Sequence, residues 1–314
     1  MSAAAQHELA IDVRGLVKRF GDKTAVDGVD IQMPRGQVWG FLGPNGSGKT
    51  TTIRMICGLL DPTEGQGRAL GYDILTESAA IKRRTGYMTQ KFSFWGDLTI
   101  RENLEFVARL YELEHLSDQV DRTLEILGLA DRQHQLAGAL SGGWKQRLAL
   151  GAVTMHQPQL LLLDEPTAGV DPQARRDFWD EIHRLSSAGL TVLVSTHYMD
   201  EAERCDRIVY LAYGKLITEG RVSEVIAESG LITFRGVGDD VRPLSAYLES
   251  QPGVEHAAYF GAALHVSGQD RAALERAIAT VDPSAATWEE VAPGLEDAFI
   301  ALMSRTGGDL RVHS

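Results

Sequence analysis

The residue spacing with the clearest chemical meaning is a glycine-rich run that ends in lysine and threonine. It reads Gly43-Pro44-Asn45-Gly46-Ser47-Gly48-Lys49-Thr50, then Thr51, and it follows an apolar run at 38–42. Glycines let successive backbone N–H groups turn toward an anion, and the start of a helix adds further donors. In a strand–loop–helix setting this pattern predicts a phosphate-binding loop, with Lys49 on the β- and γ-phosphates and Thr50 on Mg²⁺.

Two adjacent carboxylates follow the most apolar run of the chain. Leu160-Leu161-Leu162-Leu163 has the length of a buried strand, and Asp164 and Glu165 come directly after it. An acidic residue at such a strand end is the usual second Mg²⁺ anchor beside a phosphate loop, which favours Asp164 as the metal ligand. Glu165 is then placed to polarise a water molecule as a general base. The alternative, two solvated carboxylates, fits poorly with an intact phosphate loop.

Three further segments allow a functional and a structural interpretation. Leu140-Ser141-Gly142-Gly143 opens a helix and makes either a second anion-binding nest or only a helix cap. Phe20 is a candidate for stacking on a nucleotide base, or it is a core aromatic. His197 ends an apolar strand and is a candidate contact for a γ-phosphate, although a single histidine is more often structural.

These residues need a scaffold of alternating strands and helices, so we expect an α/β fold. Apolar alternation and turn residues predict a loop at 18–21, a helix at 174–185 and a helical insertion at 91–157. Thr99, with Glu102 three residues later, is expected to cap a helix in that insertion. The strands are expected at 9–13, 26–33, 38–42, 86–90, 160–163, 191–197, 208–211 and 215–218.

The composition changes after residue 222, which divides the chain into an expected nucleotide-binding domain, 1–222, and an accessory domain, 223–314. The second part alternates strand-like and helical pieces in the order β-α-β-β-α-β plus a helix. This order predicts a small α+β domain of the split βαβ, or ferredoxin-like, type. No catalytic pattern is visible in it.

Bulk properties narrow the class of protein. The 314 residues carry a formal net charge of −12, which argues against nucleic acid as the main partner. Two cysteines are too few for a disulfide framework, so we expect a reduced, cytoplasmic setting. No signal-peptide pattern and no apolar run of bilayer length is present. Any work at a membrane is therefore expected to go through a partner.

Six motifs in this order resemble the ATP-binding cassette (ABC) ATPases over residues 9 to about 222. The stretch that ends in Gln90 resembles the Q-loop of that family, 140–143 its signature sequence and 160–165 its Walker B strand. Asp171 is similar to the D-loop aspartate and His197 to the switch histidine. Trp144 departs from the glutamine common at the fifth signature position, and Phe20 from the commoner tyrosine.

The resemblance implies a P-loop NTPase (RecA-like) core with an antiparallel β subdomain and a helical subdomain. It also implies a head-to-tail dimer around two ATP molecules. Each ATP would lie between Lys49 of one copy and Ser141-Gly142-Gly143 of the other, and Asp171 would cross the interface. Glu165 would drive hydrolysis, and Gln90 would link Mg²⁺ and the γ-phosphate to a transport partner. No catalytic position is degenerate, so an active ATPase is expected.

Residues 89–99 and 196–202 resemble heads of bacterial ABC-2 type exporters, which act with a separate permease chain for drugs, polysaccharides or lipid-linked substrates. This implies a peripheral position on the inner face of the cell membrane. Phe92, Phe94 and Trp95 are expected to line the groove that receives a cytoplasmic helix of the permease, or else to pack in the helical insertion.

Three other classes are less well supported. The first class acts on ribosomes or on DNA. Its ribosome-acting members usually have two cassettes in one chain, whereas this sequence shows one. Its DNA-acting members usually have coiled coils or zinc modules, and the sequence shows neither pattern. An importer head is compatible with the sequence. A regulator that binds ATP without turnover disagrees with the intact Glu165 and His197. The transported substrate meets the permease, so the sequence does not identify it.

Overall fold

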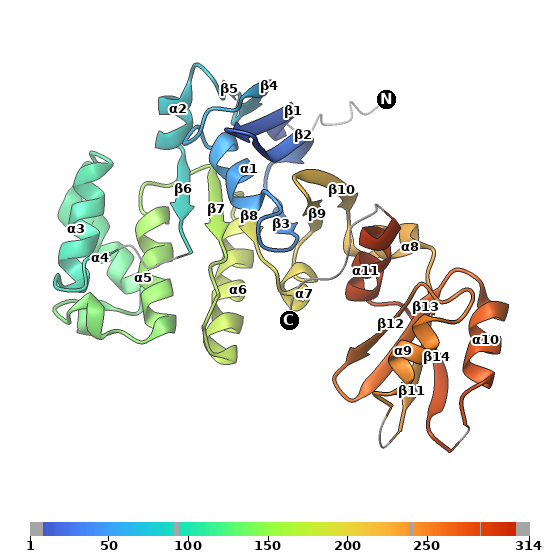
Figure 1. Ribbon diagram of the computed structural model, residues 1–314. Helices are drawn as coiled ribbons and strands as arrows, with labels where there is room; N and C mark the ends of the chain where they lie inside the picture. The colour runs from blue at the N-terminus through green and yellow to red at the C-terminus, as the bar shows by residue number, and fades with distance from the viewer. Residues whose placement is uncertain (1–8, 91–93, 239–240, 283, 306–314) are drawn as a thin grey trace, which may run out of the picture. The chain divides into compact units, whose positions relative to one another are not determined.

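The structure, a computed structural model of the chain, describes residues 9–90, 94–238, 241–282 and 284–305 (Figure 1). The chain divides into two compact units, Met1–Leu216 and Ile217–Ser314. Each unit has an apolar core of its own. Within the described residues, no helix has both the length and the apolar character that crossing a bilayer requires.

A six-stranded sheet forms the centre of the first unit, and the division between the two units falls within its edge strand, Lys215–Gly220. Its order is β10 (Lys215–Gly220), β9 (Arg207–Ala212), β3 (Val38–Leu42), β8 (Thr191–Ser195), β7 (Leu160–Asp164) and β6 (Thr85–Met88). The strands β3, β7 and β8 are buried along their whole length, as expected for parallel strands with both faces covered. Because the pairs from β9 to β6 are parallel, the carboxyl ends of these strands lie along one edge.

An antiparallel sheet adjoins this centre. Its order is β2 (Lys23–Pro34), β1 (Leu9–Phe20), β4 (Glu64–Ala69) and β5 (Tyr72–Asp73). The predicted loop at 18–21 is wrong, because β1 continues through irregular pairing with β2 as far as Phe20. One apolar core joins β1, β2, β3 and the helix α1 (Lys49–Ile56).

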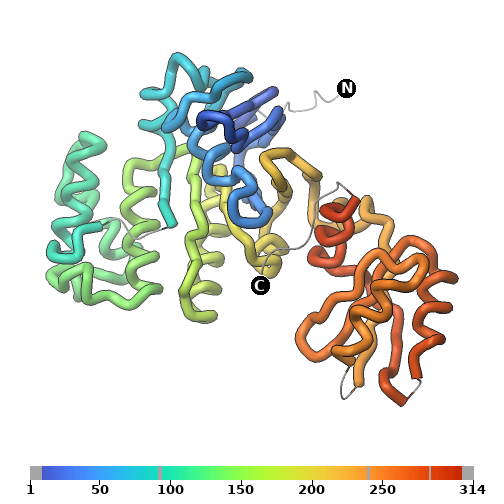
Figure 2. Tube along the Cα trace, in the orientation of Figure 1, coloured from blue at the N-terminus to red at the C-terminus, as the bar shows by residue number. Residues whose placement is uncertain are grey.

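Helices cover the central sheet and form a lobe beside it. α2 (Ser78–Arg83) precedes β6, while α6 (Pro172–Ser187) packs on β3 and β8 and α7 (Met199–Ala202) packs on β3. The lobe holds α3 (Ile100–Leu110), α4 (Leu116–Leu127) and α5 (Gly142–Thr154) around its own apolar core (Figure 2). The predicted cap is confirmed, since Thr99 and Glu102 form a reciprocal capping box at the start of α3.

The second unit is an antiparallel sheet with helices. It contains α8 (Val222–Ser229), β11 (Ile232–Val237), α9 (Leu244–Glu249), β12 (His256–Phe260), β13 (Ala263–Gly268), α10 (Arg271–Ala279), β14 (Thr287–Val291) and α11 (Leu295–Arg305). The strand order is β12-β13-β11-β14, and every neighbouring pair is antiparallel. Between β11 and β14 the elements follow the order β-α-β-β-α-β. The α/β class expected for the chain, with a small α+β unit at its end, is confirmed.

Candidate functional site

The glycine-rich loop connects β3 to α1, and backbone carbonyl groups of other segments pack closely against two of its glycines. Gly43 has φ +140°, and a Cβ atom there would lie 1.9 Å from the carbonyl oxygen of Leu211. Gly48, with φ +104°, caps the start of α1, and a Cβ there would lie 2.7 Å from the carbonyl oxygen of Ala25. Only glycine fits both places, so the loop keeps the backbone conformation that exposes its N–H groups.

Lys49 is the first residue of α1 and is buried. Its Nζ donates hydrogen bonds to the carbonyl oxygens of Gly43 at 2.7 Å and Pro44 at 3.1 Å. Burial lowers the pKa of this ammonium group, while the nearby carboxylates of Glu165 and Asp164 act in the opposite direction. The side chain therefore lies folded across the loop with its charge beside the acidic strand end.

Thr50 and Asp164 come from different segments and meet at the edge of the sheet. The Thr50 hydroxyl donates to Asp164 Oδ1 at 3.1 Å, and the Ser195 hydroxyl donates to the same oxygen at 2.6 Å. Tyr87 donates to Oδ2 at 3.4 Å. A hydroxyl and a carboxylate held together are the hard oxygen ligands that Mg²⁺ prefers, with water and phosphate oxygens completing its shell. The residues present thus fit a magnesium ion.

Glu165 lies between two polar side chains at this edge. Gln90 Nε2 donates to Glu165 Oε2 at 2.8 Å, and His197 Nδ1 lies 3.6 Å from Oε1. The backbone of Glu165 has φ +47°, and its N–H donates to the carbonyl and the hydroxyl of Ser195. Such a conformation is strained for a residue with a side chain and is typical of functional positions. The three residues expected to act on a γ-phosphate are therefore together.

The loop opens into a cavity of about 480 Å³. Among the described residues, its lining is residues 45–51 of the loop together with Phe20, Lys23, Ala25, Gln90 and Glu165. Phe20 is 51% exposed, which excludes the core-aromatic interpretation. Its ring lies at the end of β1, with Lys18 Nζ 5.4 Å from the ring centroid. The cavity is thus lined by two lysines, a glutamate and an aromatic ring, a combination that suits a nucleoside triphosphate.

The second glycine nest does not reach this cavity. Ser141 and Gly142 are exposed at the start of α5, and none of the described residues that line the cavity comes from 140–144. Ser141 makes no side-chain cap hydrogen bond, which argues against the interpretation as a simple cap. A Cβ at Gly143 would lie 2.7 Å from Cβ of Ala174, so the nest abuts the start of α6. Asp171 caps that helix by accepting from the N–H groups of Gln173 and Ala174.

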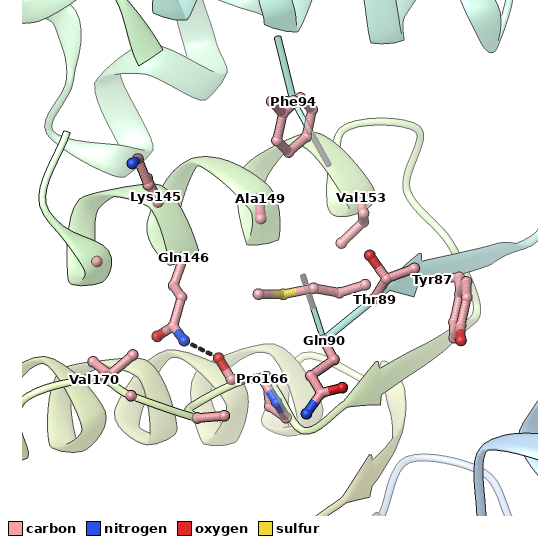
Figure 3. A pocket seen from close by; sticks show the side chains of 14 residues that line it. Tyr87, Thr89, Gln90, Phe94, Lys145, Gln146, Ala149, Val153, Pro166 and Val170 are labelled. Carbon is pink, nitrogen blue, oxygen red and sulfur yellow. Dashed lines mark hydrogen bonds between the residues drawn. The ribbon is translucent and has the colours of Figure 1, made fainter. Parts of the chain in front are cut away.

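A smaller cavity of about 170 Å³ lies between α5 and the strand ends (Figure 3). Gln90 and Phe94 line it, and Gln146 from α5 donates to the carbonyl oxygen of Pro166 across it. Trp95 is 45% exposed and meets the ring of Phe106 edge to face at 4.4 Å. Phe92, the third expected groove residue, lies outside the described residues.

The sequence interpretation missed the residues that hold Asp164. Ser195 and Tyr87 lie on β8 and β6, the strands on either side of β7, and both donate to that carboxylate. A signal was available, because parallel strand ends share an edge and both residues are polar at or near such an end. The missing knowledge was the strand order, which places 85–88 beside 160–164.

Comparison with known proteins gives consistent matches. The family model described as ABC transporter matches residues 26–168. The chain is 46% identical over 224 residues to the probable multidrug ABC transporter ATP-binding protein YbhF of Escherichia coli, covering 71% of this chain and 39% of that protein. The chain therefore spans about two fifths of the length of that relative.

Other relatives are covered over most of their length. The daunorubicin resistance ATP-binding protein DrrA3 of Streptomyces coeruleorubidus is 41% identical, with 71% of this chain and 72% of that protein covered. The Nod factor export ATP-binding protein I of Rhizobium meliloti is 34% identical, with 96% and 90% covered. A solved dimeric ATP-binding cassette in a post-hydrolysis state, bound to ADP and Pi, matches with a TM-score of 0.62 at 26% identity, covering 67% of this chain and 98% of that one.

Proposed function

Because this chain belongs to the family of ABC transporter ATP-binding proteins, we propose that it is the ATP-hydrolysing subunit of an ABC-2 type exporter that drives a separate membrane permease. One observation carries the enzymatic part of the proposal. The carboxylate of Glu165 lies between Gln90 and His197 and lines the cavity that the phosphate loop opens into. This arrangement combines a phosphate cradle with a general base.

Each residue of the site has a separate role in the transfer of the γ-phosphoryl group to water. The loop N–H groups and Lys49 bind the β- and γ-phosphates and balance their charge, and Phe20 stacks on the base. Glu165 accepts a proton from the attacking water, while His197 and Gln90 hold that carboxylate and the γ-phosphate in line. Thr50 and Asp164 would hold Mg²⁺, which neutralises charge on the phosphate oxygens when bound.

A second copy, or a paired ABC head, completes the site. Ser141 and Gly142 lie at an exposed helix start that does not line the cavity of their own chain. An anion bound at this helix start would therefore belong to a nucleotide held by another molecule. A head-to-tail pair would place this nest over the ATP held by Lys49 of its partner. The similarity to a dimeric cassette bound to ADP and Pi supports this arrangement.

The transport partner is an integral-membrane permease, and the chain lies at the cytoplasmic face of the membrane. The names of the relatives support export, including multidrug, daunorubicin and Nod factor export or resistance. We place the contact with a permease helix at the cavity beside Gln90 and Phe94, with the exposed Trp95 at its side. The net charge of −12 does not suit a nucleic-acid partner.

The first test compares native protein with Glu165→Gln and Lys49→Ala. Glu165→Gln removes the general base but keeps the phosphate cradle, so we expect turnover to fall by about 10²–10⁴-fold while ATP binding remains. Lys49→Ala should lose ATP binding. Turnover in Glu165→Gln equal to that of the native chain would remove Glu165 from this role.

The same two variants test the partner. Tagged Glu165→Gln with ATP and Mg²⁺ should recover a polytopic membrane protein in about equal amount from detergent-solubilised membranes of the source cell, and Lys49→Ala should recover less of it. Recovery of ribosomes or DNA-associated proteins without a membrane protein would contradict the transport proposal.

A further inference from the structure

A buried carboxylate outside the proposed mechanism lies behind the site. Glu201 belongs to the short helix α7, and 0% of its surface is exposed. Removing a carboxylate from water is strongly unfavourable unless hydrogen bonds and a positive charge compensate. The groups that compensate Glu201 therefore show what this residue holds in place.

Both oxygens of Glu201 accept a hydrogen bond from a buried threonine. Thr167 Oγ1 donates to Oε1, and Thr196 Oγ1 donates to Oε2 at 2.7 Å. The positive charge comes from Arg175, whose Nε lies 3.5 Å from Oε1. One carboxylate thus joins the segment after β7, the segment after β8 and the first part of α6.

Each of these segments carries a residue of the candidate site. Thr167 comes two residues after Glu165, and Thr196 comes directly before His197. The Thr196 hydroxyl also accepts from the N–H of Tyr198 at 3.0 Å, so it is fixed on both sides of the histidine. Arg175 lies on α6, one turn after the capping residue Asp171.

We propose that Glu201 is a positioning residue for hydrolysis, which sets the distance between the general base and the switch histidine. That distance is 3.6 Å, and the links from the two threonines to Glu165 and His197 are only two and one residues long. A shift of either threonine is therefore passed on to the reacting groups, where an error near 1 Å costs about 10²-fold in rate. The inference rests on the proposed ATPase function and adds a residue to it.

A purely structural role would depend on packing and not on the hydroxyl groups. Thr→Val keeps the shape of the side chain and removes the donor, whereas Thr→Ser keeps the donor and removes a methyl group. The two substitutions therefore separate the two explanations at Thr167 and at Thr196. Packing predicts that Ser is the harmful change, and positioning through Glu201 predicts that Val is.

The test measures kcat and KM for ATP hydrolysis in full-length Thr167→Val, Thr167→Ser, Thr196→Val and Thr196→Ser. We expect each Val variant to lose about tenfold or more in kcat with KM within about threefold, and each Ser variant to stay within about twofold of native kcat. Val variants with native kcat, or Ser variants that lose as much as Val, would overturn the proposal.

Glu201→Gln tests the carboxylate itself, with Glu203→Gln as the matched control on the exposed end of α7. Glu201→Gln should lower kcat at least as much as the Val variants, and adding Thr167→Val should lower it little further, because both changes break one interaction. If Glu201→Gln does not fold, the Val and Ser pairs decide alone. Equal turnover in native protein and Glu165→Gln would overturn the proposed function, and this inference with it. If turnover falls in Glu165→Gln but stays native in the Thr167, Thr196 and Glu201 variants, only the inference is overturned.

Discussion

Gly43 shows how closely the phosphate loop is packed at the level of a single residue. The atom nearest to a Cβ at Gly43 is the carbonyl oxygen of Leu211 on β9, a backbone atom that cannot move without shifting the strand. Gly71, in the turn between β4 and β5, also has a positive φ, of +86°, but nothing lies within 4 Å of a Cβ there. The two glycines therefore share a positive φ, although not the same value, and differ in the space around them.

This difference gives a stability prediction. Gly71→Ala should lower the free energy of unfolding by about 1 kcal/mol, since it adds only backbone strain. Gly43→Ala should lower it by about 3 kcal/mol or more, because the methyl group must also displace backbone at 1.9 Å. Urea unfolding of both variants measures the difference. Equal losses would mean that the loop yields without cost and that Gly43 is not required by packing.

At the scale of the element, the helical lobe contains a half-buried histidine. His156 follows α5 and stacks on Tyr111 at the end of α3, with ring centroids 3.8 Å apart and planes 5° from parallel. Burial lowers the pKa of His156 to about 4, below its usual value of 6.5. The folded chain therefore keeps this ring neutral at a pH where the unfolded chain would protonate it.

The sign of the pH effect follows from proton binding. Between pH 6.5 and 4 the unfolded state binds the extra proton, so the contribution of His156 is complete above 6.5 and is lost as the pH falls toward 4. Because the ring is partly exposed, we expect about 1 kcal/mol lost between pH 7 and 5, or about 2–4 °C in Tm. His156→Phe keeps the stack and should flatten this fall, whereas His134→Phe, an exposed position, should not. Parallel pH profiles for His156→Phe and native protein would contradict the prediction.

Elements that depend on short-range patterns were predictable, and contacts between distant segments were not. The strand–loop–helix at 38–56 and the Thr99 cap follow from spacing within a few residues. The end of β1 at Phe20 depends on irregular pairing with β2, which has no local signal. The burial of Glu201 depends on Thr196, which lies close to it in the sequence, and on Thr167, which lies on another segment. A charged residue in a helix is normally exposed, so the sequence alone would indicate an exposed side chain at Glu201, whereas the structure buries it.

At the scale of the whole molecule, the two units have separate cores, and the site belongs entirely to the first. Every described residue that lines the phosphate cavity lies between Phe20 and Glu165. The second unit is built around a different apolar cluster that includes Leu248, Leu264 and Leu274. The proposed dimer must therefore form through the nests and loops of the first unit, whatever the second unit adds.

This dimer gives the last prediction. In Glu165→Gln with ATP and Mg²⁺, we expect light scattering after gel filtration to show the mass of two 34.3 kDa chains, and without nucleotide the mass of one. Adding Gly142→Asp should prevent the dimer, because it places a negative charge where the phosphates of the partner's ATP must approach. The change should not disturb the fold, since a Cβ there meets only the Gly169 carbonyl at 4.0 Å and an acidic residue in the first helical turn is favourable.

Two controls make the dimer result specific to the nest. ATP binding to the isolated chain should persist in Gly142→Asp, because Gly142 does not line the phosphate cavity of its own chain. Gly142→Ala, which adds bulk without charge, should weaken the dimer less than Gly142→Asp. A dimer that survives Gly142→Asp at native strength would show that the nest does not face the partner's nucleotide. The exposed start of α5 would then need a different role.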